Sequence, residues 1–170
     1  MTELHSSGDV PRLHLRTSVN GKPVVREIEP RLLLLDFLRD DLGLKGAKRS
    51  CDVQVCGTCT VLLDGLPVSA CTTLAYEAMD RQLLTIEGLS ADGELHPLQA
   101  AFIDHSALQC GFCTPGMILA AKSLLDEQPN PTRADMQAYF KGNLCRCTGY
   151  YYILDAVAEA AETLAGRARG

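Results

Sequence analysis

Eight cysteines are the residues of this 170-residue sequence whose type and spacing point most directly to chemistry. Residues 1–9 contain no basic region followed by an apolar run, so we expect no secretory signal and a cytoplasmic protein. In a reducing compartment thiols do not persist as structural disulfides, and free thiols in this number are an oxidation liability. Metal binding is therefore the favoured explanation for both sets of four: Cys51, Cys56, Cys59 and Cys71, then Cys110, Cys113, Cys145 and Cys147.

The first set has the spacing C-x4-C-x2-C plus a later cysteine, which is typical of plant-type [2Fe–2S] ferredoxins. One loop would supply three thiolates around a compact cluster, and Cys71 would close the site. Gly57 would let the backbone approach the cluster sulfides without a Cβ atom in the way. A structural zinc site also uses four thiolates, but zinc sites usually present paired C-x2–4-C knuckles, which this loop lacks.

The second set combines C-x2-C with C-x-C. If Cys110 and Cys113 lie at a helix end, their separation places both on one face. Cys145 and Cys147 cannot share a face within a helix, so they need a loop between two helices. Taken alone, this four-thiolate site fits zinc or a cluster; beside a ferredoxin-like loop, a second cluster is favoured.

The N-terminal half contains the signals of a β-sheet. Asn20-Gly21 between two alternating runs predicts a hairpin over residues 12–28, and the leucines of residues 31–42 predict an amphipathic helix. A second hairpin is predicted from Thr60 to Leu63 and Pro67 to Ser69 around Asp64-Gly65, and a further strand near Leu83 to Ile86.

The pattern becomes helical after Ser90, so we expect a boundary between Ser90 and Glu94, separating domains of residues 10–90 and 91–166. Four helices are predicted. They run from Pro97 to His105, from Gly116 to Glu127 with Thr114 as N-cap and Pro115 at N1, from a capping box at Thr132–Asp135 to Lys141-Gly142, and from Tyr150 to Gly166.

Composition excludes several classes of protein. With 46% hydrophobic and 22% charged residues the chain is globular, and its net charge of −5 argues against a nucleic-acid or anionic-membrane surface. The longest strictly apolar run, residues 32–35, is too short to span a bilayer.

The other chemically capable side chains have simpler explanations. No ligand-like spacing relates the four histidines, so each is expected to be a surface or cap residue: His5, His14, His96 and His105. Lys45, Lys48 and Arg49 precede the first cysteine loop. They would offset a cluster's negative charge, face a partner, or form a solvated basic turn.

Three motifs resemble one family over nearly the whole chain: CGTCTV at residues 56–61, QCGFCTPG at 109–116 and NLCRCTGY at 143–150. They are similar to the iron–sulfur subunit of molybdenum hydroxylases, which include xanthine oxidase, aldehyde oxidase and aerobic carbon monoxide dehydrogenase. The resemblance implies an α+β fold with an N-terminal β-grasp plant-type ferredoxin domain and a C-terminal four-helix bundle. It also implies a large molybdopterin subunit, with the cytosine dinucleotide form, and an FAD subunit as partners.

The resemblance further implies that electrons pass from molybdenum through the helical-domain cluster and then the ferredoxin-type cluster to FAD. Cys147 would lie beside the pterin amino group and Gln109 would hydrogen-bond the pterin; a helix-cap or buried amide is the alternative for Gln109. Many members have glycine where this chain has Asp52 and Gln54. Asp52 resembles the carbon monoxide dehydrogenase branch, and the change bears on cluster hydrogen bonding and potential.

We therefore expect an electron-transfer subunit without substrate-transforming residues of its own. Two alternatives stay open: a free-standing two-cluster ferredoxin serving another enzyme, and a zinc-stabilised interaction module. The expected subunit would bury an extensive interface through its second domain, of more than about 2,000 Å² as obligate interfaces do.

Overall fold

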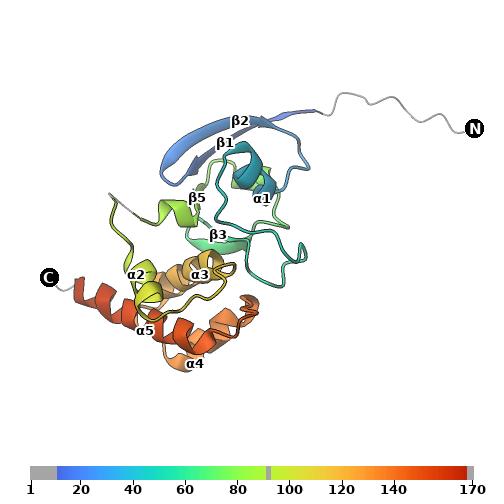
Figure 1. The fold of residues 1–170 in the computed structure, drawn as a ribbon. Helices are drawn as coiled ribbons and strands as arrows, with labels where there is room; N and C mark the ends of the chain where they lie inside the picture. The colour runs from blue at the N-terminus through green and yellow to red at the C-terminus, as the bar shows by residue number, and fades with distance from the viewer. Residues whose placement is uncertain (1–10, 91–92, 168–170) are drawn as a thin grey trace, which may run out of the picture.

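The computed structural model describes residues 11–90 and 93–167, and it places a mixed β-sheet beside a layer of helices (Figure 1). His5, the segment 1–9 examined for a secretory signal, and residues 91–92 of the expected boundary lie outside the described residues. The five-stranded sheet has the order β2-β1-β5-β3-β4. Its strands are β1 Leu13–Val19, β2 Lys22–Ile28, β3 Thr60–Leu63, β4 Leu66–Ser69 and β5 Gln82–Leu84. β1 pairs in parallel with β5, and the other pairs are antiparallel.

Both predicted hairpins are confirmed. Asn20 and Gly21 connect β1 to β2 with φ of 53° and 75°, the left-handed pair that a two-residue hairpin turn requires. Asp64 and Gly65 connect β3 to β4 in the same way, with φ of 50° and 81°. The second strand of that hairpin begins at Leu66, one residue before the prediction.

The helix predicted over residues 31–42 is shorter and less regular than expected. It consists of α1 Leu34–Asp36 followed by the π-helical turn η1 Phe37–Asp41. Leu33 is extended, with φ of −74° and ψ of 144°, because it forms an isolated β-bridge with Leu74. That long-range pairing, reinforced by the Leu34 N–H donating to the Thr73 carbonyl at 2.8 Å, delays the helix start.

The strand predicted near Leu83 to Ile86 is also shifted. β5 ends at Leu84, and the next residues form the 3₁₀ helix η3 Ile86–Gly88. Thr85 separates the two elements. Its N–H donates to Asn20 Oδ1 at 2.8 Å, which holds the end of the strand against the first hairpin turn.

Four α-helices follow, as predicted: α2 Pro97–Asp104, α3 Thr114–Glu127, α4 Arg133–Tyr139 and α5 Tyr150–Arg167. Two further 3₁₀ helices are η2 Ala75–Ala78 and η4 Phe140–Gly142. Figure 1 shows α3 lying next to β3, between the sheet and the other helices. Ser123 of α3 donates its hydroxyl to the Gly65 carbonyl at 2.9 Å, which ties this helix to the β3–β4 turn. None of the helices in the described ranges is long and apolar enough to cross a bilayer.

The helix ends test the capping predictions. Thr132 and Asp135 form the predicted capping box, with Asp135 N–H donating to Thr132 Oγ1 at 3.2 Å and Thr132 N–H to Asp135 Oδ2 at 2.9 Å. His96 caps α2, its Nδ1 accepting the Leu98 N–H at 3.2 Å. The N-cap of α3 was predicted one residue too late: Cys113 is already in αR conformation and caps the helix, so Thr114 is its first residue.

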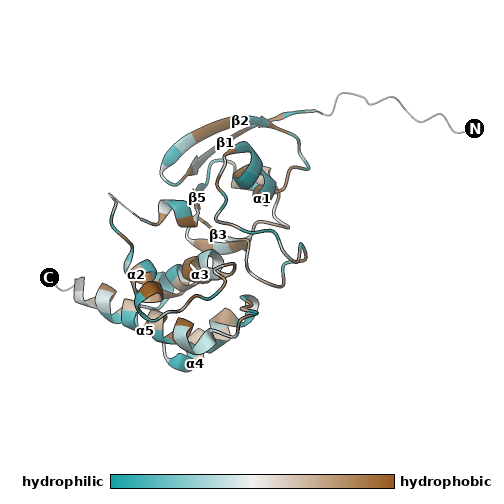
Figure 2. Ribbon diagram, viewed as in Figure 1, coloured by the Kyte–Doolittle hydropathy of each residue, from teal (hydrophilic) through white to brown (hydrophobic). Residues whose placement is uncertain are grey.

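Each layer has its own core. Leu15, Leu34 and Phe37 belong to a buried cluster beneath the sheet, and Phe102 and Met117 belong to a second cluster among the helices. Figure 2 shows hydrophobic segments along α2 and α3 as well as along the strands. The two apolar clusters hold the sheet layer and the helical layer separately, and the cysteine loops lie where the layers meet.

Candidate metal centres

The first cysteine loop lies between η1 and β3 and curls back on itself over residues 51–59. Three residues of this stretch have positive φ: Asp52 at 54°, Gln54 at 59° and Gly57 at 69°. This curl directs backbone amides toward the thiols, and the Val55 N–H donates to Cys51 Sγ at 3.4 Å. Convergent amides are the environment that stabilises thiolates.

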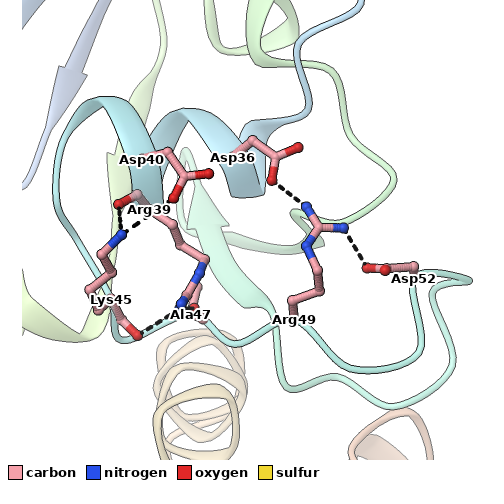
Figure 3. Close-up of polar contacts among 7 residues, drawn as sticks. All are labelled: Asp36, Arg39, Asp40, Lys45, Ala47, Arg49 and Asp52. Carbon is pink, nitrogen blue, oxygen red and sulfur yellow. Dashed lines mark hydrogen bonds and ion pairs between the residues drawn. The ribbon is translucent and has the colours of Figure 1, made fainter.

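Asp52 and Gln54 therefore occupy backbone conformations that glycine adopts most easily. Asp52 is tolerated there and is further held by Arg49, whose guanidinium bonds both Asp36 and Asp52, the latter at 2.9 Å (Figure 3). Gln54 Oε1 accepts a long hydrogen bond of 3.4 Å from the Thr72 hydroxyl.

The basic residues before this loop bond to neighbouring carbonyls and carboxylates and so fix the chain that leads into the loop. Lys45 bonds the Arg39 carbonyl and reaches Asp40 Oδ1 at 3.3 Å (Figure 3). Lys48 donates to the carbonyl of Gly46 at 2.8 Å, and burial lowers its pKa. These cations bond carbonyls and carboxylates of neighbouring residues, while Lys45 and Arg49 stay exposed to solvent.

The four thiols of the first set meet in two pairs. Amide hydrogen bonds, led by that of Val53, lower the pKa of Cys51 to about 6, and its thiol also bonds that of Cys56. Burial raises the pKa of Cys59 to about 12, and the neighbouring Cys71 thiol bonds it and adds to the rise. The structure thus brings the four predicted residues together as two pairs, and the pairs are neighbours because Cys56 also interacts electrostatically with Cys59.

The second set also meets in two pairs. Cys110 is exposed in the turn before α3; the Phe112 amide and the Cys147 thiol lower its pKa. Cys113 lies at the N-cap of α3, where burial raises its pKa to about 12 and the Cys145 thiol bonds it. Cys145 and Cys147 lie in the loop between η4 and α5, as predicted.

Gln109 lies beside this second set. Its Nε2 donates to the Cys147 carbonyl at 3.2 Å, and its side chain is exposed. It is thus neither a buried amide nor a helix cap, and the two residues predicted to face the pterin lie together at the surface.

The two cysteine loops touch each other. The Leu144 N–H donates to the Cys56 carbonyl at 2.9 Å. This hydrogen bond joins a cysteine of the first set to the residue that precedes Cys145 of the second set. The buried Asn143 donates Nδ2 to the Gly57 carbonyl at 3.3 Å. We call these contacts, together with Gly116, the seam. A cavity of about 430 Å³ opens beside it, and Ser50, Cys56, Thr58, Cys110, Phe112, Cys113, Leu144, Cys145, Arg146 and Tyr150 line this space.

Glycine is required at two seam positions for steric reasons. A Cβ on Gly57 would lie 2.4 Å from Asn143 Nδ2, and one on Gly116 would lie 2.2 Å from the Gly57 carbonyl oxygen. Gly57 is predicted to let the backbone approach the cluster sulfides. Close packing against Asn143 of the second loop is a further reason for glycine at this position. Sequence reasoning missed Asn143 and Gly116 as site residues, although both lie inside the motifs that carried the resemblance.

The donor set fits a thiolate-bound cluster. All eight cysteines are free thiols, and thiolates are the ligands that iron–sulfur clusters use. Within residues 11–90 and 93–167, no three His, Cys, Asp or Glu side chains are grouped to hold a metal ion; the thiols meet in pairs instead. Thr114 Oγ1, directly after Cys113, is the one buried side-chain polar atom of these residues without a hydrogen-bond partner. Sulfur acceptors of a bound cluster would satisfy such a hydroxyl.

Comparison with known proteins agrees with this chemistry. Residues 39–104 match the family described as 2Fe-2S iron-sulfur cluster binding domain, and residues 85–158 match the family described as [2Fe-2S] binding domain. Both matches place the chain among iron–sulfur electron-transfer proteins.

Individual relatives are similar over most of their length. The 6-hydroxypseudooxynicotine dehydrogenase complex subunit beta of Paenarthrobacter nicotinovorans is 48% identical, across 86% of this chain and 92% of the relative. The nicotinate dehydrogenase small FeS subunit of Eubacterium barkeri is 44% identical, across 91% and 98%. A chain in the crystal structure of quinoline 2-oxidoreductase from Pseudomonas putida 86 superposes with a TM-score of 0.87 at 46% identity, covering 92% of this chain and 97% of that one.

The chain therefore belongs to the family of small iron–sulfur subunits of molybdenum hydroxylases. It is a [2Fe–2S] electron-transfer subunit of an oxidoreductase of that type.

Proposed function

We propose that this chain relays electrons from a molybdopterin centre in a large partner subunit, through two [2Fe–2S] clusters of its own, to FAD on another partner. The observation that carries the proposal is the pairing of the eight thiols into four pairs, two on each side of the seam. When bound, each cluster supplies a one-electron carrier. The ligand assignment and the contact between the two cysteine loops follow from how the chain holds the thiols.

The pairs suggest the ligand assignment. In a [2Fe–2S] cluster four cysteines serve two irons, so each iron takes one pair of thiolates. One cluster would be held by Cys51 with Cys56 and by Cys59 with Cys71; the other by Cys110 with Cys147 and by Cys113 with Cys145. A metal also resolves the high pKa values of Cys59 and Cys113, because coordination stabilises a buried thiolate that burial alone disfavours.

The seam supports a relay rather than two independent sites. Cys56 of the first set accepts a hydrogen bond from Leu144, whose carbonyl carbon is bonded to the nitrogen of Cys145 of the second. Glycines at 57 and 116 and the buried Asn143 hold this contact rigidly. A short, fixed contact between two cofactor loops is what electron transfer between them requires.

We propose that the sheet layer and the helical layer are separate domains, each with one cluster. We assign residues 10–90 to a β-grasp ferredoxin domain and residues 91–166 to a four-helix bundle. The sheet order, with β5 central and parallel to β1, supports the first assignment. The surface pair Gln109 and Cys147 is proposed to face the molybdopterin, in its cytosine dinucleotide form, and to lie within a large interface with the molybdenum subunit. The cytoplasm is the proposed compartment.

Metal and sulfide analysis of the purified chain and its complex tests the proposal. We expect about four irons and four acid-labile sulfides per chain and two distinct cluster signals in electron paramagnetic resonance (EPR). The complex should also contain molybdenum and flavin in larger chains. Zinc in place of iron would favour the interaction module, and a fully loaded chain that never co-purifies with such partners would favour a free-standing ferredoxin.

A further inference from the structure

Cys145 is the cysteine of the second set whose polar groups are most completely bonded by its own loop. Its carbonyl accepts the Thr148 N–H at 3.2 Å, and its Sγ accepts the Gly149 N–H at 3.4 Å. Its own N–H donates to the hydroxyl oxygen of Tyr150 at 2.8 Å. The last contact is made by a side chain, so it can be removed by substitution without altering the backbone.

Tyr150 is held in place independently of this hydrogen bond. It is the first residue of α5, and its partly buried ring packs against the helical core. It also lines the 430 Å³ cavity together with Cys110, Cys113 and Cys145. The phenol group is therefore fixed at the wall of the space that the second thiol set surrounds.

The hydroxyl still has a proton to donate. A phenolic oxygen can accept one hydrogen bond and donate another, and in this structure the oxygen accepts from Cys145. Within the described part of the chain it has no second hydrogen-bond partner. Three thiols of the second set border the same cavity, those of Cys110, Cys113 and Cys145, together with Cys56 of the first set and the hydroxyl residues Ser50 and Thr58. A cluster bound by the second set would add sulfides as acceptors.

We propose that Tyr150 is a positioning residue that raises the reduction potential of the helical-domain cluster, an inference that rests on the proposed function. The hydroxyl fixes Cys145 through its N–H and donates its own proton to a sulfur in the cavity. Reduction adds negative charge that spreads onto the sulfurs, so a hydrogen-bond donor stabilises the reduced state more than the oxidised state. We expect the first-domain cluster to keep its potential, because the residue that the hydroxyl bonds, Cys145, belongs to the second set.

A redox titration of the assembled complex, followed by EPR, tests the role of the hydroxyl. Tyr150→Phe keeps the ring and its packing. We expect it to lower the potential of the helical-domain cluster, identified as the signal that survives Cys71→Ser, and to leave the other potential unchanged. Tyr152→Phe is the matched control, because Tyr152 lies two residues further along α5 with 55% of its surface exposed; it should move neither potential. An unmoved helical-cluster potential in Tyr150→Phe, or equal shifts of both clusters, would overturn the inference.

A second variant decides the question if Tyr150→Phe fails to assemble its cluster. Replacing Tyr150 by 3-fluorotyrosine keeps the ring and the hydroxyl but makes the phenol a stronger donor, so the potential should rise. No rise in a fully loaded protein would again overturn the inference. Absence of iron and sulfide from the unaltered complex would overturn the proposed function and this inference with it, whereas intact clusters with unmoved potentials would overturn only the inference.

Discussion

Gly116→Ala is a direct test of the seam, because two known effects oppose each other at this position. Gly116 lies inside α3, where alanine normally stabilises a helix by up to about 1 kcal/mol over glycine. Here the added Cβ would lie 2.2 Å from the Gly57 carbonyl oxygen and 3.4 Å from the Thr58 Cα. These neighbours are backbone atoms of the first cysteine loop, so they cannot rotate away as a side chain would.

The overlap should outweigh the helix preference. Inserting a methyl group into a packed contact costs about 1–3 kcal/mol, so after the helix gain of about 1 kcal/mol the free energy of unfolding should fall by up to about 2 kcal/mol. For a chain of this length, that corresponds to a thermal midpoint lower by up to about 8 °C. Thermal unfolding should be followed by circular dichroism, which reports loss of secondary structure, and by cluster absorbance, which reports loss of the cluster held by the cysteine loop.

Gly166→Ala is the matched control. Gly166 lies in α5 with nothing within 4 Å of its would-be Cβ, so alanine should leave the midpoint unchanged or raise it slightly. If Gly116→Ala were as stable as Gly166→Ala, the seam would not be the tight backbone contact described above, and its role in fixing the two loops would fail.

Two further predictions concern local structure. Gln54→Gly should raise the thermal midpoint, by about 1 kcal/mol of stability, because Gln54 has a φ of 59°; Asp52→Gly should gain less, since Asp tolerates this conformation and would lose its bond to Arg49. Equal gains, or losses at both positions, would contradict this account. Asp135 has a pKa below its ordinary 3.8 because Thr132 and Gln128 donate hydrogen bonds to its carboxylate. The contribution of Asp135 to the free energy of unfolding is therefore complete above pH 3.8 and is lost as the pH falls through the lower pKa of the folded state. Asp135→Asn should therefore flatten the acid-side decline in stability, and an unchanged pH profile would refute the assignment.

The parts of the fold that are encoded locally could be predicted from the sequence. Asn20-Gly21 and Asp64-Gly65 specify their turns through residues that adopt positive φ, and Thr132 and Asp135 specify a helix start through their own hydrogen bonds. The late start of α1 could not be predicted in this way. It depends on the pairing of Leu33 with Leu74, some forty residues away, for which the local leucine pattern carries no signal.

In the candidate site, too, the locally encoded features could be predicted and the long-range contacts could not. The cysteine spacing separates the two sets correctly, and the structure pairs thiols only within each set. The seam between the sets joins Asn143 to Gly57 across 86 positions, and no local pattern could reveal that contact. The sequence singles out Asp52 and Gln54 only through the family resemblance, and the structure adds that both have positive φ, a conformation that glycine adopts without strain.

The relay order is the central claim, and Cys71→Ser tests it most directly. Cys71 belongs to the first thiol set and pairs with Cys59, whereas Gln109 and Cys147 form the proposed molybdopterin-facing surface beside the second set. In rapid-reaction measurements on the assembled enzyme, the variant should leave substrate reduction of the molybdenum centre and the helical-domain cluster intact while slowing flavin reduction. Normal flavin reduction in a variant whose first-domain cluster is absent or redox-silent would contradict the linear route.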